Sequence, residues 1–414
     1  MKSFSEISLC APLRSNLTKH GFTEPTPVQA LAVAPILAGR NVVATAQTGT
    51  GKTLAFVLPL IQLLGEEAPG SGVRSLILTP TRELAIQIHE VFEKMAAGTG
   101  ISAAVVVGGL SEKTQLNAIR KGAQVLIATP GRLCDFLTRK LARLGGVRIL
   151  ILDEADRMLD MGFLPTIKRI LAATPADRQT LFFSATIESS VQHLVEAHAR
   201  NAVRVEVGSI TKPSEQVDLH VYEVEQDSKL GLLQMLLRRE QGPFLVFART
   251  KHGADRLSKR LAREGVKAAT IHGDRSQNQR NDALRGFQEG YYRVLVATDV
   301  AARGIHVEGI SHVVNYDLPQ VPEDFIHRVG RTGRAGARGI AATFGTRSER
   351  SEISRIERTL AIKLTRQPVP VELGGQRPGT ASVVMIEAAA VRQRRWMSFG
   401  GPSRSGRRRA SASR

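Results

Sequence analysis

The chain has 414 residues, of which 42% are hydrophobic, and a formal net charge of +19. This length predicts two domains of ordinary size with a large buried core, and the hydrophobic fraction excludes a wholly disordered chain. The excess of basic residues indicates a polyanionic partner, most simply a nucleic acid. The alternative is a basic surface that is only solvated.

The two cysteines, Cys10 and Cys134, lie far apart without metal-ligand spacing. They predict a reducing compartment and no disulfide framework. The first residues, MKSFSEISLCAPL, lack a long apolar core after the basic residue, so no secretory signal is expected. No uncharged apolar run approaches the roughly 20 residues that a membrane-spanning helix needs. We therefore expect a soluble, cytoplasmic and monomeric protein that does not contact a membrane.

Strand and helix patterns alternate through the first half of the chain. Helices are predicted from Ser8 to His20 and from Pro27, which pre-sets a first helical turn. Beyond the β-branched run at Val42, strands are predicted at Ser75–Thr79, Ala103–Val107, Gln124–Ala128, Arg148–Leu152 and Thr180–Phe183. One helix between them should bury the apolar stripe Leu84, Ile88, Val91 and Met95. This alternation predicts an α/β fold, a doubly wound parallel sheet with helices on both faces.

A polar segment rich in glycine and proline, GSITKPSEQ, interrupts the pattern at Gly208–Gln216. Alternation then restarts, with a helix at Lys251–Glu264 and strands at Leu219–Val224, Phe244–Phe247, Ala268–Ile271, Val294–Ala297, His312–Val314 and Ile340–Phe344. We therefore predict a first domain at 1–208, a linker at 209–216 and a second domain at 217–366. Two similar domains of this kind would leave a cleft between them.

Residues 367–414 differ in composition from the rest of the chain. They contain nine arginines, no lysine and many Gly, Ser and Pro residues. This composition predicts a disordered basic tail, whose interleaved Trp396 and Phe399 could stack on bases. The apolar patch Val383–Val391 is too short to span a membrane.

The stretch NVVATAQTGTGKT, Asn41–Thr53, is predicted to bind phosphate. A strand, a glycine loop and a helix follow one another, so backbone N–H groups and the helix N-terminus would surround anionic oxygens. Lys52 would contact the β- and γ-phosphates and the Thr53 hydroxyl would hold Mg²⁺. The rest of the loop would cradle the phosphates, with Ala46 where the pattern usually has its first glycine, followed by Gln47, Thr48, Gly49, Thr50 and Gly51.

Two further segments supply the chemistry that a terminal phosphate needs. Asp153 and Glu154 end the strand RILIL, where Asp153 could hold Mg²⁺ through water and Glu154 could orient and deprotonate the attacking water. In the second half, HRVGRTGR runs from His327 to Arg334. Arg331 and Arg334 are candidates for charge-compensating groups supplied by domain closure, unless this segment is only a surface basic cluster.

These segments together resemble the DEAD-box RNA helicases over residues 1 to about 365. The first half resembles the family at Phe4, GFTEPTPVQ (Gly21–Gln29), AQTGTGKT (Ala46–Thr53), PTRELA (Pro80–Ala85), Gly108-Gly109, TPGR (Thr129–Arg132), DEAD (Asp153–Asp156) and SAT (Ser184–Thr186). The second half does so at VFART (Val246–Thr250), the pair Gln277 and Arg280, ATDVAARGI (Ala297–Ile305) and HRVGRTGR (His327–Arg334). The segments VFARTKHGAD and HGDRSQNQR most resemble the bacterial RhlE-type branch of the family.

The resemblance implies two tandem RecA-like domains that bind ATP with Mg²⁺ and hold RNA across both. Gln29 would recognise the adenine edge, with Phe22 packed on the base. Ser184, Thr186, His327 and Arg328 would couple the phosphate site to the second domain, and Asp299 and Arg303 would serve the nucleotide and the interdomain interface. RNA contacts would come from Pro80, Arg82, Gly109, Thr129, Gly131, Arg132, Gly273, Arg280, Thr298 and Gly304. Because phosphate and sugar contacts carry no sequence code, little sequence preference is expected.

One position departs from the family pattern, because His306 stands where an acidic residue is usual. This change could weaken nucleotide affinity or closure, or it could be a harmless surface change. The leading hypothesis is an RNA-dependent ATPase that unwinds short duplexes. The alternatives are an RNA chaperone or annealing protein that acts through its basic tail, and a DNA translocase with the same ATP machinery. Ribosome assembly and RNA decay are both open as settings that would supply protein partners.

Overall fold

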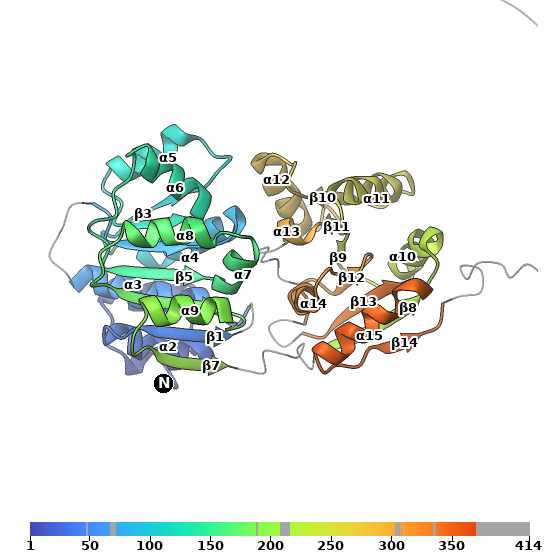
Figure 1. The fold of residues 1–414 in the computed structure, drawn as a ribbon, viewed down its shortest axis with the longest axis horizontal. Helices are drawn as coiled ribbons and strands as arrows, with labels where there is room; N and C mark the ends of the chain where they lie inside the picture. Colours follow the sequence, from blue (N-terminus) through green and yellow to red (C-terminus); the bar gives the residue numbers. More distant parts are fainter. Residues whose placement is uncertain are drawn as a thin grey trace, which may run out of the picture. The chain divides into compact units, whose positions relative to one another are not determined.

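The computed structural model describes residues 1–46, 49–66, 72–187, 189–207, 216–302, 307, 309–333 and 337–369. These residues form two α/β lobes, which we call lobe 1 (residues 1–207) and lobe 2 (residues 216–369) (Figure 1). Each lobe contains one parallel sheet of seven strands, so the prediction of two doubly wound domains is confirmed.

The elements of lobe 1 alternate as the sequence predicts. Its strands are β1 (Val42–Ala46), β2 (Ser75–Leu78), β3 (Ala103–Val106), β4 (Val125–Ala128), β5 (Ile149–Asp153), β6 (Gln179–Ser184) and β7 (Val203–Val207). Its helices are η1 (Phe4–Glu6), α1 (Ala11–Lys19), α2 (Pro27–Leu37), α3 (Lys52–Glu66), α4 (Arg82–Ala96), α5 (Glu112–Arg120), α6 (Pro130–Thr138), α7 (Ala155–Asp160), α8 (Leu164–Ala172) and α9 (Ser189–His198).

Lobe 2 repeats the alternation. Its strands are β8 (Val217–Glu223), β9 (Phe244–Phe247), β10 (Ala268–Ile271), β11 (Val294–Ala297), β12 (His312–Asn315), β13 (Gly339–Gly345) and β14 (Thr365–Gln367). Its helices are η2 (Gln226–Ser228), α10 (Lys229–Arg239), α11 (Lys251–Arg263), α12 (Gln277–Gln288), α13 (Asp299–Ala302), α14 (Pro322–Val329), η3 (Arg347–Glu349) and α15 (Arg350–Thr359).

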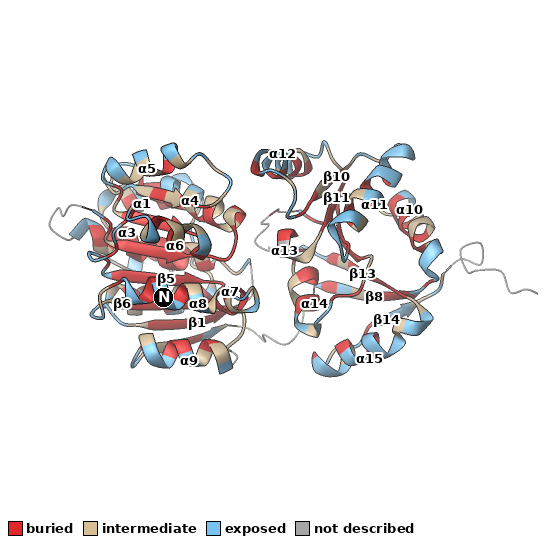
Figure 2. Ribbon diagram, turned by 45° about the horizontal axis from the view of Figure 1, so that its top comes forward, coloured by how far each residue is buried: buried red, intermediate tan, exposed pale blue. Residues whose placement is uncertain are grey.

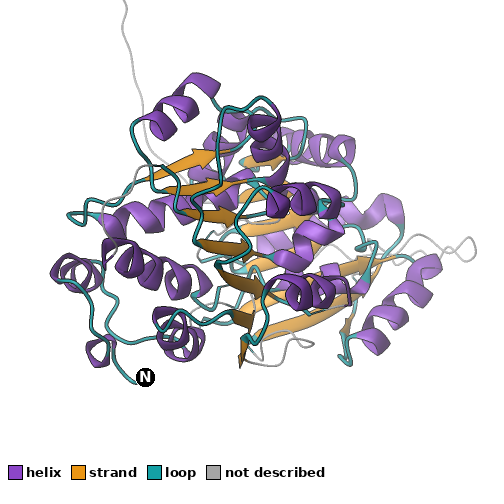
Figure 3. Ribbon diagram, turned by 60° about the vertical axis from the view of Figure 1, so that its left-hand side comes forward, coloured by secondary structure: helices purple, strands orange, loops and turns teal. Residues whose placement is uncertain are grey.

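The two sheets share one topology. Lobe 1 has the order β3-β4-β2-β5-β6-β1-β7 and lobe 2 has the order β10-β11-β9-β12-β13-β8-β14. Subtracting seven from each number of the second order gives the first, so the two lobes are copies of one fold. The central strands are buried between helices on both faces, whereas the edge strands β7 and β14 are largely exposed (Figures 2 and 3). A sheet covered on both faces requires continuous apolar strands, as the runs ILIL in β5 and VLVA in β11 illustrate.

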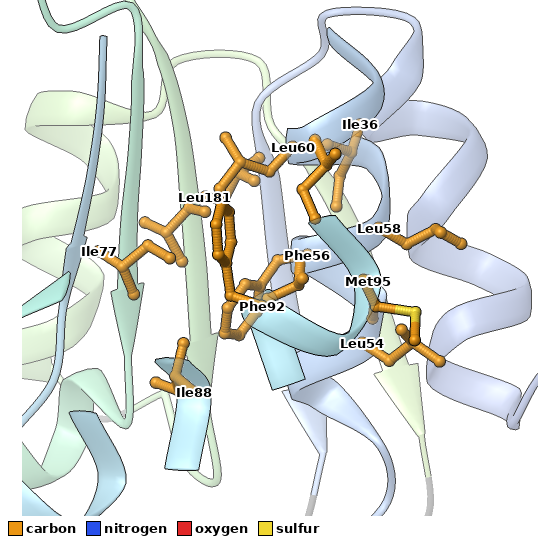
Figure 4. Close-up of a cluster of buried hydrophobic side chains, with 14 of the residues drawn as sticks. Ile36, Leu54, Phe56, Leu58, Leu60, Ile77, Ile88, Phe92, Met95 and Leu181 are labelled. Atoms are coloured by element: carbon orange, nitrogen blue, oxygen red, sulfur yellow. The ribbon is translucent and has the colours of Figure 1, made fainter. Parts of the chain in front are cut away.

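The core of lobe 1 fixes the helix that begins with Lys52. Side chains of α3 such as Leu54, Phe56 and Leu60 pack against Phe92 of α4 and Leu181 of β6 (Figure 4). The ring centroids of Phe56 and Phe183 lie 5.1 Å apart. The rest of α3 is therefore held rigidly over the sheet, which sets where its N-terminus lies relative to the end of β1.

The structure differs from the predicted elements at three places. Two edge strands, β7 and β14, were not predicted. Lobe 2 also extends past the predicted end at residue 366, because β14 includes Gln367 and Val369 packs against the lobe 2 core. On α4, the fully buried stripe contains Ala85, Ile88, Phe92 and Met95, whereas Leu84 and Val91 are only partly buried at its border.

Within the described residues, no helix is both long and apolar enough to cross a bilayer. The predicted tail from residue 370 onward, and residues 209–215 of the predicted linker, lie outside the described residues.

The hydrophobic clusters predict that each lobe can be destabilised by itself. Each cluster draws its residues from one lobe only, and Ile151 and Leu245 are fully buried in lobe 1 and lobe 2 respectively. Ile151→Ala should destabilise lobe 1 by about 2–5 kcal/mol through the lost burial and the cavity. Hydrogen exchange should rise across β1 to β6 and stay unchanged in lobe 2. Leu245→Ala should give the reverse pattern, and equal effects of either change on both lobes would contradict separate cores.

Candidate functional site

The loop after β1 places Lys52 at the carboxyl edge of the lobe 1 sheet. Lys52 begins α3 and is buried, and its Nζ donates a hydrogen bond to the carbonyl oxygen of Ala46 at 2.8 Å. Gly51 has φ +90°, and a Cβ there would lie 2.5 Å from Nε2 of Gln29. Only glycine therefore fits this turn. Thr53 lies one residue further along α3, and Gln47 and Thr48 fall outside the described residues.

Gln29 braces this loop from α2. Its Nε2 donates to the Gly51 carbonyl oxygen at 3.0 Å, and its Oε1 accepts from the backbone N–H of Thr26 at 2.9 Å. The side chain is 3% exposed, so both ends of its amide are held by the protein. Phe22 lies partly buried against the same core. The sequence indicated Gln29 as a base-recognising residue but gave no sign of its contact with the phosphate loop.

An acidic turn follows β5, beside Lys52. Asp153 ends the strand, and Glu154 adopts a left-handed conformation with φ 52° and ψ 53°. Such a backbone costs a non-glycine residue about 1–3 kcal/mol and is typical of functional turns. Burial raises the pKa of Asp153 to about 7, against the opposing effect of Lys52 and with a further increase from Glu154. The turn therefore stores both backbone strain and a poorly solvated carboxyl group.

Asp156 joins this turn to the loop after β6. Its Oδ2 accepts hydrogen bonds from the backbone N–H of Ala185 at 2.9 Å, the N–H of Thr186 at 2.7 Å and Oγ1 of Thr186 at 3.1 Å. Its own N–H donates to Oγ of Ser184 at 3.1 Å. Ser184 and Thr186, predicted to couple the site to lobe 2, here connect two loops of lobe 1.

The oxygen atoms of this turn suit Mg²⁺. The Asp153 carboxylate and the Thr53 hydroxyl are hard ligands, and no group of three or more His, Cys, Asp and Glu side chains in the described part of the chain could hold a metal by itself. Mg²⁺ usually keeps several waters and is held by one or two protein oxygens together with substrate phosphates. A cation beside Asp153 would also favour its charged form, which burial disfavours.

The predicted RNA-contacting residues of lobe 1 follow three neighbouring strands. Pro80 follows β2, Thr129 follows β4 and Gly109 follows β3, and these strands are adjacent in the sheet. The guanidinium group of Arg82 lies against Gly109, where a Cβ would come 3.2 Å from its Cζ. Gly109 has φ +77°, a backbone that favours glycine, and an added Cβ would push the end of the Arg82 side chain aside.

The predicted RNA contact Arg132 already has acidic partners. It donates to Glu112 Oε2 and to Asp135 Oδ2, each at 2.8 Å. Arg139 also donates to Glu112, and these arginines, Arg139 foremost, lower the pKa of the partly exposed Glu112 to about 2. A phosphate that binds Arg132 would have to share it with these carboxylates. Gly131 is exposed one residue earlier.

In lobe 2, the buried Arg328 forms an ion pair with the partly buried Asp299. Arg328 binds both carboxylate oxygens of Asp299 and donates from Nη1 to the carbonyl oxygen of Asp317 at 2.7 Å. Arg331 is also buried, and its Nε donates to the carbonyl oxygen of His327 at 3.1 Å. Arg331, Arg328, His327 and Asp299 line a small pocket that Arg157 of lobe 1 also lines. The candidates Arg303, Gly304 and Arg334, and the unusual His306, lie outside the described residues.

Glu83 is a residue of this site that the sequence analysis missed. It is buried at the start of α4, and its Oε1 accepts from Nε2 of Gln277 at 2.9 Å. Its Oε2 lies 2.7 Å from Nη2 of Arg280, a predicted RNA contact. The pairing thus joins the segment of Arg82 to α12 of lobe 2. In the sequence Glu83 stands inside PTRELA (Pro80–Ala85), but no local pattern indicates that its carboxylate pairs with Arg280. The remaining predicted contacts, Gly273 and Thr298, follow β10 and β11, which are adjacent strands.

Comparisons with known proteins match this arrangement. Residues 26–194 match the DEAD/DEAH box helicase family and residues 228–336 match the helicase conserved C-terminal domain. A DEAD-box ATP-dependent RNA helicase CshA of Streptococcus pneumoniae is 40% identical over 79% of the chain, which spans 62% of that relative. An ATP-dependent RNA helicase RhlB of Pseudomonas syringae pv. tomato is 41% identical over 79% of the chain and 85% of the relative. The RhlE-type assignment therefore stays a prediction.

Solved structures agree with these matches. Dbp5 of S. cerevisiae, bound to RNA and ADP BeF3, gives a TM-score of 0.80 at 33% identity, covering 89% of this chain and 96% of Dbp5. Mss116p bound to ssRNA and AMP-PNP gives 0.81 at 28% identity, covering 89% of this chain and 80% of Mss116p. Both likenesses extend over the two lobes.

The buried carboxyl of Asp153 predicts an unusual pH dependence of stability. Its pKa is about 7 in the fold against an ordinary 3.8, so the folded state binds the proton more tightly. That contribution to stability is present at acid pH and is lost as pH rises through about 7, on the order of 4 kcal/mol in total. Asp153→Asn should therefore stabilise the ligand-free protein at alkaline pH, measured by urea unfolding across this pH range. A variant less stable than the wild type at alkaline pH would contradict the assignment.

Proposed function

Because this chain belongs to the DEAD/DEAH box helicase family, we propose that it is an RNA helicase that couples RNA-stimulated ATP hydrolysis to the bending and unwinding of short duplexes. The observation that carries this proposal is the division of one sheet edge. Lys52 begins the helix that follows β1 and Asp153 ends β5, whereas the loops after β2, β4 and β3 hold the expected RNA contacts. One rigid sheet would therefore present ATP and RNA to lobe 2 together.

The phosphate end of ATP would be held by lobe 1. Lys52 would exchange its bond to the Ala46 carbonyl for phosphate oxygens, while the N–H groups of Gly49 to Thr53 turn toward the same anion. Thr53 and Asp153 would hold Mg²⁺, which supplies charge neutralisation at the β- and γ-phosphates when bound. Gln29 keeps the Gly51 turn in place, so adenine recognition and phosphate binding would share one brace.

Glu154 would orient and deprotonate the attacking water. Its left-handed backbone places a carboxylate directly after Asp153, and α7 begins at the next residue. The water oxygen would form a bond to the γ-phosphorus as the bond to the leaving ADP oxygen breaks, and Glu154 would take the proton. Arg331 and Arg334 would offset the charge that develops on the γ-phosphoryl oxygens. Loss of that phosphoryl group would then release the arginines and let the lobes part.

The RNA would be gripped through its backbone. Arg82, Arg132 and Arg280 supply charge-assisted donors, and Gly109, Gly131 and Gly273 allow close approach of a strand. Such contacts read the sugar and phosphate rather than the base, so RNA would be preferred over DNA without a strong sequence preference. We also propose that this protein is monomeric and cytoplasmic and that it binds ribosome-assembly or RNA-decay proteins. The support for this proposal is the strong basic charge and the free thiols of Cys10 and Cys134.

The test of this proposal is ATP hydrolysis with and without single-stranded RNA, in the wild type and in Glu154→Gln. The amide cannot accept the proton but keeps the shape of the side chain. Hydrolysis should therefore fall at least ~100-fold, while binding of ATP and RNA persists as a long-lived complex. Glu93→Gln, an exposed change on α4, is the matched control and should leave turnover intact. RNA-stimulated hydrolysis that survives in Glu154→Gln would defeat the assignment.

The Arg82 contact gives a second prediction. Gly109→Ala should displace the guanidinium group from its place beside the glycine, so RNA affinity should fall about tenfold while ATP binding stays unchanged. The control is Gly122→Ala. Gly122 also has a positive φ, of +92°, but no atom lies within 4 Å of the added Cβ, so it reports the backbone strain alone. Equal RNA affinities for the two variants, measured by fluorescence anisotropy, would show that Arg82 does not contact RNA.

A further inference from the structure

Helix α11 of lobe 2 presents a stripe of basic side chains to solvent. Its inner face buries Ala254, Leu257 and Leu261 against the sheet (Figure 2). Its outer face exposes a set of cations spaced three or four residues apart, namely Arg256, Lys259, Arg260 and Arg263. Within the part of the chain that the structure describes, none of these four forms an ion pair, although acidic partners neutralise many other arginines of the protein. The stripe therefore carries uncompensated positive charge.

The stripe begins beside the loop that contains Gly273. Lys251, the first residue of α11, places its Nζ 2.6 Å from Oδ2 of Asp274. From the next turn, Asp255 accepts a hydrogen bond from Nε2 of His272 at 3.0 Å and another from Arg275. The Gly273 loop, a proposed RNA contact, is therefore fastened to the first turns of α11 from both sides. A strand that passes Gly273 would find the start of the stripe directly next to it.

The stripe ends at an exposed aromatic ring. Lys267 follows α11 and is exposed, and its Nζ lies 4.7 Å from the ring centroid of Tyr291. Tyr291 is 58% exposed, which is unusual for so large a hydrophobic side chain, and it packs edge-on against Tyr292 at 4.8 Å. A cation and an open ring of this kind are the elements on which single-stranded nucleic acids bind without sequence preference.

We propose that the outer face of α11 from Arg256 to Arg263, together with Lys267 and Tyr291, forms a second RNA track on lobe 2. It would extend the grip on a strand beyond the proposed contacts at Gly273. This proposal rests on the proposed function in one respect, namely that an RNA strand reaches the stripe from the contact at Gly273. The chemistry of the track requires only a polyanion with stacking bases. Continuity with the Gly273 loop and the open Tyr291 ring favour RNA over an acidic protein surface, which offers no bases to stack.

The test compares RNA of two lengths in the full chain. The triple variant Arg256→Gln, Lys259→Gln, Arg263→Gln removes three exposed charges and keeps good helix formers. The control triple variant Arg14→Gln, Lys19→Gln, Lys94→Gln removes the same charge from exposed positions on α1 and α4 of lobe 1. Each protein is titrated with an oligouridylate of about 8 nucleotides and with one several times longer, over a range of salt concentrations.

With the long strand, the α11 variant should bind about tenfold more weakly. Its plot of log affinity against log salt should be shallower by about 2, because each phosphate contact on a single strand contributes about 0.7. The short strand should bind as in the wild type, and the control should match the wild type at both lengths. Tyr291→Ala should also weaken the long strand about tenfold, with no change in salt slope.

Two results would overturn the track. The first is an α11 variant whose long-strand affinity and salt slope equal those of the control. The second is an equal loss on both strand lengths, which would place the charges in the main RNA site. An acidic polypeptide is also tested for binding to each protein. If it bound the wild type but not the α11 variant, while both proteins bound the long strand equally, the surface would bind protein and the track would be wrong. Stimulation of ATP hydrolysis by the short strand tests the proposed function separately. Failure of the RNA track can therefore be distinguished from failure of the proposed function.

Discussion

The whole arrangement depends on one constraint, that all paired strands of each sheet run parallel. Parallel strands bring the loops that follow them to one edge, so chemistry placed after different strands meets there. In lobe 1 this edge has two halves. Asp153 and Ser184 end β5 and β6, and Lys52 begins the helix that follows β1. The loops after β3, β4 and β2 hold Gly109, Thr129 and Pro80. Since β2 and β5 are neighbours and both are buried along their whole length, the two halves adjoin.

The nucleotide half of the edge is built at the expense of stability. Lys52 and Asp153 are buried charged groups, Glu154 has a left-handed backbone, and Asp156 must accept three hydrogen bonds to hold the neighbouring loop. Lobe 2 has the same topology, but the lysine at the start of α10 has different contacts from Lys52. There Lys229 is fully buried and donates to the carbonyl oxygen of Tyr316, with Glu349 3.6 Å away. Lys229 therefore has both a carbonyl oxygen and a carboxylate of lobe 2 close to its ammonium group.

The sequence was sufficient for the elements whose signals are local. Buried parallel strands such as Phe244–Phe247 and Val294–Ala297 are continuous apolar runs, so their bounds matched the structure. The edge strand β14 is short and polar, and its pairing depends on β8 far away in the chain, so no local pattern indicated it. The same holds for the site. Lys52 and Asp153 stand in recognisable local patterns, but the contacts Gln29–Gly51 and Glu83–Arg280 join segments that are distant in sequence.

The central claim is that the two halves of this edge are coupled, and mutual binding of the two ligands tests it most directly. The affinity for single-stranded RNA would be measured with and without a non-hydrolysable ATP mimic, and the affinity for the mimic with and without RNA. The account predicts that each ligand strengthens the other by the same factor, on the order of 5- to 150-fold, because a coupling free energy is reciprocal. Binding of each ligand that is indifferent to the other would contradict it.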